Sequence, residues 1–180
     1  AEIFAPTYGS LYRMCTTMDM QFVMIGTGER WCEDEINTLQ SKLPNFRALI
    51  GYSEAKSHLI EAGSDFFLMP SRYEPCGLNQ MYSLRYGTLP IVRRTGGLAD
   101  TVQNYNEMTG EGTGFMFDQL TPQAVYDTVG WAVYAYYNKK EHIAAMQQRG
   151  MQQDFTWEKS CHQYEDVYKE ALARGCGRQL

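Results

Sequence analysis

Short apolar runs bounded by glycine or proline recur along the chain as far as residue 118. Each run is almost continuously hydrophobic, which is typical of a strand that is buried on both faces. Stretches with helical spacing of apolar residues separate these runs. The alternation predicts an α/β fold in which a doubly wound parallel sheet carries helices on both faces. The predicted strands cover residues 20–26, 46–52, 66–71, 89–94 and 114–118, and the helices cover about 31–43, 53–63, 78–86 and 98–106.

Beyond residue 118 the pattern predicts helices alone. Thr121 is placed to cap the first of them, and Pro122 suits the first helical position, where a missing N–H costs little. A second helix is predicted over about 139–150, and a last one follows Thr156. One face of the last helix carries a stripe that we expect to pack into the core: Trp157, Cys161, Tyr164 and Tyr168.

Residues 1–19 differ from the rest because they show no clear period. The chain contains no internal repeat and no flexible linker. We therefore expect a single domain over residues 1–180 that begins partway through a larger fold.

Composition narrows the classes of function. A chain of 180 residues is long enough to bury a full core, and its net charge of -5 argues against a nucleic-acid surface. No apolar run approaches the roughly 20 residues that cross a bilayer, and the first residues do not resemble a signal peptide. The five cysteines have no CxxC spacing, so we expect free thiols in a reducing cytoplasm and neither a metal site nor a disulfide framework. They are Cys15, Cys32, Cys76, Cys161 and Cys176.

Candidate chemistry lies in the loops after the strands, where open parallel sheets bind ligands. Two of these loops lead glycine into a helix start, at Gly77–Leu78 and at Gly96-Gly97-Leu98. A helix N-terminus suits a phosphate, and glycine lets the backbone approach it closely. A tight turn without a ligand is the alternative for either loop.

Glu74 favours a ligand site over a tight turn without a ligand. It lies between two prolines, just before the first glycine turn. A carboxylate beside a phosphate site is electrostatically unfavourable unless it has a specific role, and its acceptor oxygens are suited to the hydroxyls of a sugar. The combination predicts a site for a nucleotide-linked sugar.

The stretch "PSRYEPCGLNQMYSLRYGTLPIVRRTGGLADTV", residues 70–102, resembles the donor-binding half of bacterial glycogen synthases and plant starch synthases. These are retaining glycosyltransferases with two Rossmann-like domains, the GT-B fold. The segments "QFVMIGTGE", "IGYSEAKSHLIEAGSDFFLMPS", "GTGFMFD" and "DFTWEKSCHQYEDVYKEAL" follow the same family in order, so that the resemblance covers about residues 20–172.

The resemblance implies transfer of glucose from ADP-glucose, or UDP-glucose in some members, to the non-reducing end of an α-1,4-glucan with retention. It implies no metal or other cofactor, no membrane or nucleic-acid partner, and a cytoplasmic or, in a plant or alga, plastid location. Glu74 matches the acid that contacts the donor glucose, and Tyr52 matches the aromatic residue that stacks on adenine. For Tyr52 the alternative is a ring that fills the end of a strand. The other residues that match the donor pocket are Cys76, Gly77, Leu78, Asn79, Thr95, Gly96 and Gly97.

The chain departs from the family pattern in three ways. Tyr82 occupies the position of a second glutamate that many related transferases carry, although the synthase branch often lacks it. The Arg and Lys that bind the donor diphosphate in the family precede the segment matching Met20, and nothing here resembles their loop. The acceptor-side domain, with its Lys-Thr-Gly-Gly loop and catalytic-site His, is absent too. Three histidines do not match that His: His58, His142 and His162.

We therefore expect the chain to be the C-terminal, donor-binding domain of such a synthase and to be inactive without an acceptor-side domain, because retaining transfer needs both halves closed around the donor. The alternative is a module that binds nucleotide or glucan without catalysis, or a partner subunit. A sucrose-forming transferase or a sugar-nucleotide epimerase of the same architecture fits "EPCGLNQMYSLRYGT" less well.

Overall fold

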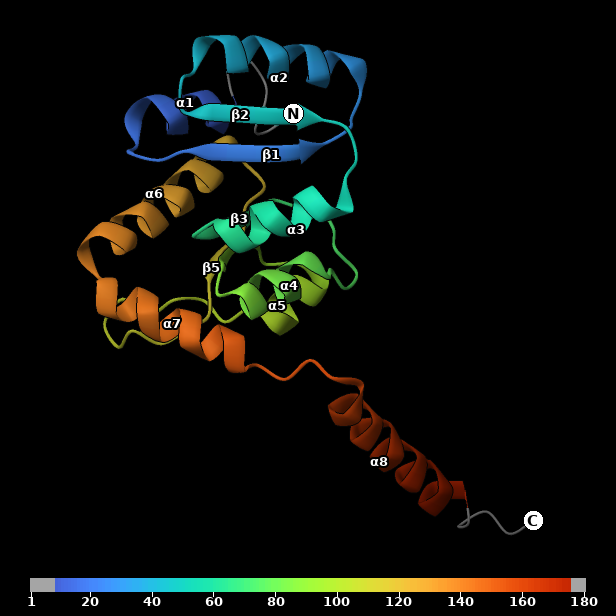
Figure 1. The fold of residues 1–180 in the computed structure, drawn as a ribbon. Helices are drawn as coiled ribbons and strands as arrows, with labels where there is room; N and C mark the ends of the chain where they lie inside the picture. The colour runs from blue at the N-terminus through green and yellow to red at the C-terminus, as the bar shows by residue number, and fades with distance from the viewer. Residues whose placement is uncertain (1–8, 176–180) are drawn as a thin grey trace.

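The computed structural model describes residues 9–175, and its elements follow the predicted alternation (Figure 1). Every predicted strand is present, although each is one or two residues shorter at an end than the apolar run that predicts it. The strands are β1 (Phe22–Gly26), β2 (Phe46–Ile50), β3 (Phe66–Met69), β4 (Leu89–Arg93) and β5 (Phe115–Phe117). The helices are α1 (Ser10–Thr17), α2 (Arg30–Lys42), α3 (Glu54–Gly63), α4 (Asn79–Tyr86), α5 (Gly96–Thr101), α6 (Pro122–Asn138), α7 (Lys140–Gln152) and α8 (Trp157–Gly175).

Neighbouring strands are parallel, as predicted, but they form two sheets where the sequence predicts one. β1 pairs with β2, and β4 lies between β3 and β5. β1 and β3 are not hydrogen-bonded to each other within residues 9–175. A cavity of about 880 Å³ lies where the two strands face one another. Figure 1 shows β1 and β2 together and β3 apart from them.

The main core joins both sheets to α1, α2, α6 and α7. Burying one Leu or Phe side chain contributes about 1.5–3 kcal/mol, so this cluster is the main stabilising feature of the fold. Its fully buried members include Leu11, Met14, Phe46, Leu89, Phe115 and Met146.

Local signals set the helix ends. Thr121 caps α6 as predicted, since its Oγ1 accepts a hydrogen bond from the backbone N–H of Ala124 at 3.1 Å. α4 ends at Gly87, which has φ +81°, a conformation that glycine adopts without a steric penalty. Gly87 donates to the carbonyl of Leu84 at 3.1 Å, and this closes the last turn directly before β4.

The helix predicted over 98–106 is shorter and begins earlier, as α5. Tertiary contacts end it at Thr101. Asn104 forms a bridge with Gly114, and its side-chain oxygen accepts from the backbone N–H of Met116 at 2.8 Å. The Tyr105 ring is buried against Phe115, at 5.2 Å between centroids. These contacts need an extended backbone, which overrides the local helical pattern.

Two further corrections concern the ends of the described chain. Helix α1 was not predicted from residues 1–19, although Leu11 and Met14 bury one of its faces. The expected core packing of the α8 stripe is wrong, because α8 stands away from the rest and has no buried residue (Figure 1). Nothing among residues 9–175 covers this stripe: Trp157, Tyr164 and Tyr168 are 78%, 57% and 64% exposed, and Cys161 is exposed too.

The remaining cysteines in the described part of the chain are free thiols: Cys15, Cys32 and Cys76. Burial raises the pKa of the Cys15 thiol to about 11, so this thiol stays protonated and unreactive at neutral pH. Cys176 lies outside the described residues. No helix in residues 9–175 has the length and hydrophobicity that a membrane crossing requires.

Candidate functional site

The two glycine loops predicted from the sequence lie against each other. The backbone N–H of Gly97 donates to the carbonyl of Glu74 at 3.0 Å. A Cβ on Gly96 would lie 2.0 Å from that same carbonyl oxygen, and a Cβ on Gly97 would lie 2.1 Å from the carbonyl oxygen of Cys76. Gly96 also has φ +45°, which disfavours any other residue. The contact between the loops therefore requires glycine at both positions.

Gly77 forms the turn between the Glu74 segment and α4. Its φ is +73°, and a Cβ there would lie 2.4 Å from the side-chain oxygen of Gln80. Glycine therefore lets the backbone of residues 76 and 77 fold down onto Gln80.

Gln80 is a site residue that the sequence analysis missed. It is fully buried, and its Nε2 donates to the carbonyls of Cys76 and Gly77, both at 3.0 Å. The same Nε2 lies 3.1 Å from Oγ1 of Thr101, which in turn donates to the carbonyl of Gly97 at 2.6 Å. The buried side-chain amide of Gln80 thus connects the two glycine loops on their buried side.

A signal for Gln80 exists in the sequence. Gln80, Ser83, Leu84 and Gly87 are spaced as one helical face, and all four are buried in the structure. A polar residue on the buried face of a helix needs hydrogen-bond partners, so its position pointed to a polar network beneath the loop.

Glu74 lies at the surface of this pair of loops and is half-buried. Its Oε2 accepts a hydrogen bond from Oγ of Ser71 at 3.3 Å. Cys76 and Leu78 are exposed, and Asn79 opens α4, whose first N–H groups have no acceptor within the helix. The predicted carboxylate, turn and helix start are therefore adjacent.

Thr95 and Tyr52 are the last two predicted site residues, and they lie in different parts of the fold. Thr95 directly precedes α5, beside the Glu74 loop, and its side chain makes no capping hydrogen bond. Tyr52 follows β2, in the other sheet, and is 88% exposed. The ring does not fill the end of its strand, which was the alternative reading of this residue. No contact found within residues 9–175 connects Tyr52 to the pair of glycine loops.

Two arginines that were not predicted connect the neighbouring loops. Arg93, at the end of β4, donates through Nη1 to the carbonyl of Arg72 and through Nε to the carbonyl of Asp118, the latter at 3.1 Å. Arg94 forms an ion pair with Asp118 at 2.8 Å. The carboxyl ends of β3, β4 and β5 are thus connected to one another, with cationic side chains close to the glycine loops.

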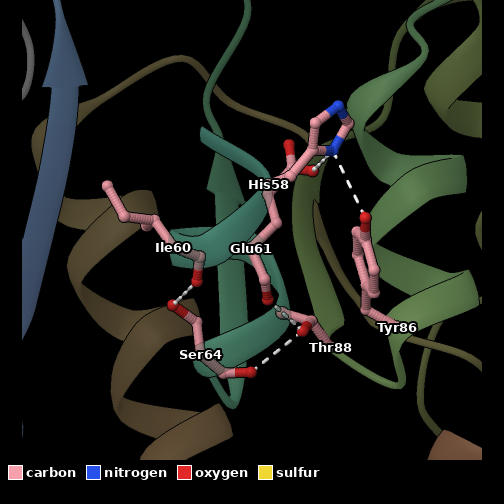
Figure 2. Close-up of polar contacts among 6 residues, drawn as sticks. All are labelled: His58, Ile60, Glu61, Ser64, Tyr86 and Thr88. Carbon is pink, nitrogen blue, oxygen red and sulfur yellow. Dashed lines mark hydrogen bonds and ion pairs between the residues drawn. The ribbon is translucent and has the colours of Figure 1, made fainter. Parts of the chain in front are cut away.

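The opposite side of α4 packs on α3 (Figure 2). Nδ1 of His58 lies 3.4 Å from Oη of Tyr86 and 3.7 Å from Oε2 of Glu61. Oγ1 of Thr88 donates to the carbonyl of Glu61 and, at 2.9 Å, to that of Ser64. These bonds attach the end of α3 to the start of β4. They therefore support α4 on the side away from the glycine loops.

The large cavity does not coincide with the loop pair. Of the residues on the α4 side of the site, the cavity contacts Pro70 and Asn79, whereas most of its lining comes from β1, β3, α3 and α6. No group of three or more His, Cys, Asp or Glu residues within 9–175 is placed to hold a metal ion. The site can therefore offer backbone N–H groups, one carboxylate and an open surface to a ligand.

Comparison with known proteins identifies the family of the chain. The model of the family described as glycosyl transferases group 1 matches residues 13–150. The chain belongs to this family. It is 63% identical over 174 residues to a glycogen synthase of Treponema denticola, covering 97% of this chain and 35% of the relative. It is 46% identical over 159 residues to a chloroplastic/amyloplastic soluble starch synthase 1 of Solanum tuberosum, covering 86% of this chain and 25% of the relative.

Among solved structures, the chain is similar to the catalytic domain of starch synthase IV from Arabidopsis thaliana bound to ADP and acarbose. The TM-score is 0.72 at 26% identity, over 91% of this chain and 42% of that one. The predicted resemblance and the GT-B assignment are thereby confirmed, and the chain is a glycogen/starch-synthase-like glycosyltransferase portion. It spans about a third of the length of the Treponema denticola relative and matches its C-terminal part.

Proposed function

We propose that this chain is the donor-binding part of a glycogen or starch synthase. It binds ADP-glucose, or UDP-glucose, so that the glucose is transferred to the non-reducing end of an α-1,4-glucan with retained configuration. The observation that carries the proposal is the packing of Gly96 and Gly97 against the backbone of Glu74 and Cys76. The names of the relatives, glycogen synthase and starch synthase, support the same assignment.

Glu74 orients the donor glucose in this proposal. A carboxylate has about four acceptor positions, so the single bond from Ser71 leaves acceptors for sugar hydroxyls. The half-buried position of Glu74 strengthens such bonds relative to bulk water. Glu74 acts as a binding and orienting residue, and the chemistry does not require it to be a nucleophile.

The diphosphate lies against the turn at Cys76 and Gly77 and the start of α4. The N-terminus of a helix carries roughly half a positive charge together with free N–H groups, and both favour an anion. Leu78 and Asn79 supply this helix start, and Thr95 with the second glycine loop lines the other side. Tyr52 offers an exposed ring for stacking on the adenine.

Transfer then proceeds by departure of the nucleoside diphosphate and attack of the acceptor hydroxyl on the same face of the sugar. Such a step requires a second domain that closes over the donor, because water would otherwise compete and the geometry would not be fixed. The chain supplies the donor side of this arrangement, and an acceptor-side domain supplies the rest.

The donor site is tested by thermal unfolding in the presence of ADP. A ligand at about 100 times its Kd stabilises a protein by about 2.7 kcal/mol, which is about 5–10 °C in Tm at this size. We expect ADP to raise Tm and to slow proteolysis, and UDP measured in parallel gives the nucleotide preference. A Tm that neither nucleotide changes would contradict the donor site.

Transfer is tested with radiolabelled ADP-glucose and glycogen. The chain is assayed alone and together with the part of the Treponema denticola relative that lies outside the matched stretch. Incorporation only in the combined sample supports a partial enzyme. If ADP binds while the combined sample stays inactive, the chain is a binding module without catalysis.

A further inference from the structure

The segment that carries Glu74 has no regular secondary structure of its own. Residues 70–78 connect β3 to α4 and form neither a helix nor a strand. Pro70 begins the segment and has no N–H to donate to β4, and the last paired residues of the two strands are Met69 and Val92. The position of Glu74 therefore depends on individual bonds that reach the segment from its neighbours.

Arg93 supplies one of these bonds where the pairing of β3 with β4 stops. It is the last residue of β4 and pairs with Phe117 of β5. Its guanidinium donates through Nε to the carbonyl of Asp118, at 3.1 Å, and through Nη1 to the carbonyl of Arg72. Arg93 thus bridges the loops that follow β5 and β3, across the end of the strand that lies between them.

An arginine side chain is well suited to this bridge. The guanidinium is planar and always charged, and donors on its separate nitrogens can reach two acceptors at once. Hydrogen bonds from a charged donor are roughly twice as strong as neutral ones, and the half-buried position of Arg93 strengthens them further. The end of the Glu74 segment that leaves β3 is therefore firmly attached to β4.

A second bond holds the same segment two residues further on. The carbonyl of Glu74 accepts from the backbone N–H of Gly97 at 3.0 Å. Arg93 and Gly97 both lie where the chain leaves β4, so one short stretch holds both ends of residues 72–74. Pro75 also disfavours a helical backbone at Glu74. Little freedom is left in the backbone that directs the carboxylate.

We propose that Arg93 is a positioning residue for Glu74. By holding the carbonyl of Arg72, its guanidinium fixes the direction of the Glu74 carboxylate toward the sugar of a bound donor. It acts through the backbone and does not touch the ligand. This inference rests on the proposed function, in which Glu74 orients the donor glucose. The alternative role, direct contact of the Arg93 cation with the diphosphate, predicts an equal loss of affinity for ADP and ADP-glucose when Arg93 is replaced.

Amide hydrogen exchange tests the positioning without a ligand. R93M keeps an unbranched side chain but removes both hydrogen bonds. We expect the Gly97 amide to exchange at least about fivefold faster in R93M, because its acceptor, the Glu74 carbonyl, is no longer held in place. The Gly87 amide, which donates to the carbonyl of Leu84 at the other end of α4, should keep its rate and reports that the chain is folded. Unchanged exchange at Gly97 overturns the proposal.

Competition titrations with ADP and ADP-glucose test the effect on the sugar. In R93M the affinity for ADP-glucose should fall about fivefold, while the affinity for ADP stays within about twofold. An equal loss for the two ligands would make Arg93 a ligand of the diphosphate and would overturn the proposal.

Two further variants test the geometry of the bridge. R93K keeps the charge without the planar fork, so it should lose ADP-glucose affinity as R93M does. An R93K chain that binds like the unsubstituted one contradicts the bridge. R85M is the matched control, because Arg85 of α4 donates to the carbonyl of Met151 at 2.8 Å, a bond of the same kind away from the Glu74 segment. It should leave the ratio of the two affinities unchanged.

A double substitution shows whether Arg93 acts through Glu74. With E74A present, R93M should lower ADP-glucose affinity by less than about twofold, since the effects of coupled residues do not add. A full fivefold loss in both backgrounds overturns the proposal. If the unsubstituted chain binds neither ligand, the donor site is wrong and the role of Arg93 toward the sugar is wrong with it. If E74A selectively weakens ADP-glucose binding and R93M does not, only the role of Arg93 is wrong.

Discussion

The two sheets of this chain differ in how completely they are packed. β4 is buried from Leu89 to Val92, and every residue of β5 is buried. In the other sheet Val23 and Leu49 are 50% and 40% exposed. The loops that carry Glu74 and the two glycine turns follow β3 and β4, in the three-stranded sheet. The proposed donor site therefore lies on the sheet whose strands β4 and β5 are the more deeply buried.

This difference shows how the loop pair can be rigid before a ligand arrives. Its contacts are backbone to backbone, from Glu74 and Cys76 to Gly97, and a buried amide supports them. Preorganised groups of this kind lose little entropy when a ligand binds. The β1–β2 sheet has no comparable support along its open edge within residues 9–175. We therefore expect donor binding to depend more on the packing of the β3–β4–β5 sheet than on that of the β1–β2 sheet.

The largest effect is expected from G97A. The added Cβ would lie 2.1 Å from the carbonyl oxygen of Cys76, which forces the two loops apart. Overpacking usually costs about 1–3 kcal/mol, and a backbone contact this close should reach about 3 kcal/mol or more. We expect a lower Tm and loss of ADP binding, measured by calorimetry. G63A is the control, because no atom lies within 4 Å of its new Cβ. If G97A binds ADP like the unsubstituted chain, the loop contact is not part of the site.

A smaller effect is expected from Q80L. The substitution removes the hydrogen bonds to Cys76, Gly77 and Thr101, which are partly buried, at about 1–3 kcal/mol. ADP affinity should fall about tenfold or more, because the turn is no longer held. Q148L, at an exposed position of α7, should change neither Tm nor affinity. A loss of Tm with unchanged affinity would make Gln80 a purely structural residue.

The third effect separates the sugar from the nucleotide. E74A should weaken ADP-glucose binding about tenfold, or about 1.4 kcal/mol, while ADP affinity stays within about twofold. S71A is the control, since it removes only the bond to one carboxylate oxygen. Competition titrations with ADP and ADP-glucose measure both affinities. Equal losses for the two ligands would contradict the sugar role of Glu74.

The sequence predicted the strands of the three-stranded sheet well because their signals are local. Buried parallel strands are short apolar runs. Gly96 and Gly97 mark a turn that only glycine can form in contact with another backbone, and Gly77 marks a turn with positive φ against the side chain of Gln80. Arg93 escaped prediction because its partner Arg72 is distant in the chain, and the helical face that carries Gln80 does not reveal its distant partner Thr101.

Periodicity also failed where tertiary contacts decide. The α8 stripe has the spacing of a buried face but has no partner in residues 9–175. The break between β1 and β3 is equally invisible in the sequence, since each strand has a normal apolar pattern. What an element packs against is a property of the assembled fold, and no local pattern contains it.

The smallest effect concerns Glu61, in the helix that connects the two sheets. Its side chain is buried, and Oε2 has no hydrogen-bond partner among the described residues; Nδ1 of His58 lies 3.7 Å away. Burial raises the pKa of this carboxyl, and His58 opposes the shift. Folding therefore favours the neutral acid. The stabilisation is complete below the unfolded pKa of about 4.3 and is lost as the pH rises through the higher folded pKa.

E61Q should remove this dependence, because an amide does not ionise. Denaturant unfolding at pH 4–7 should show E61Q gaining stability relative to the unsubstituted chain as the pH rises, by about 1 kcal/mol or less. E54Q, at the exposed start of the same helix, should keep the original slope. The comparison is repeated in an H58Q background, where the slope due to Glu61 should steepen, because His58 opposes the rise in the pKa of Glu61. If E61Q keeps the original pH dependence in both backgrounds, Glu61 is ionised in the folded chain and is solvated from the open cavity that it lines.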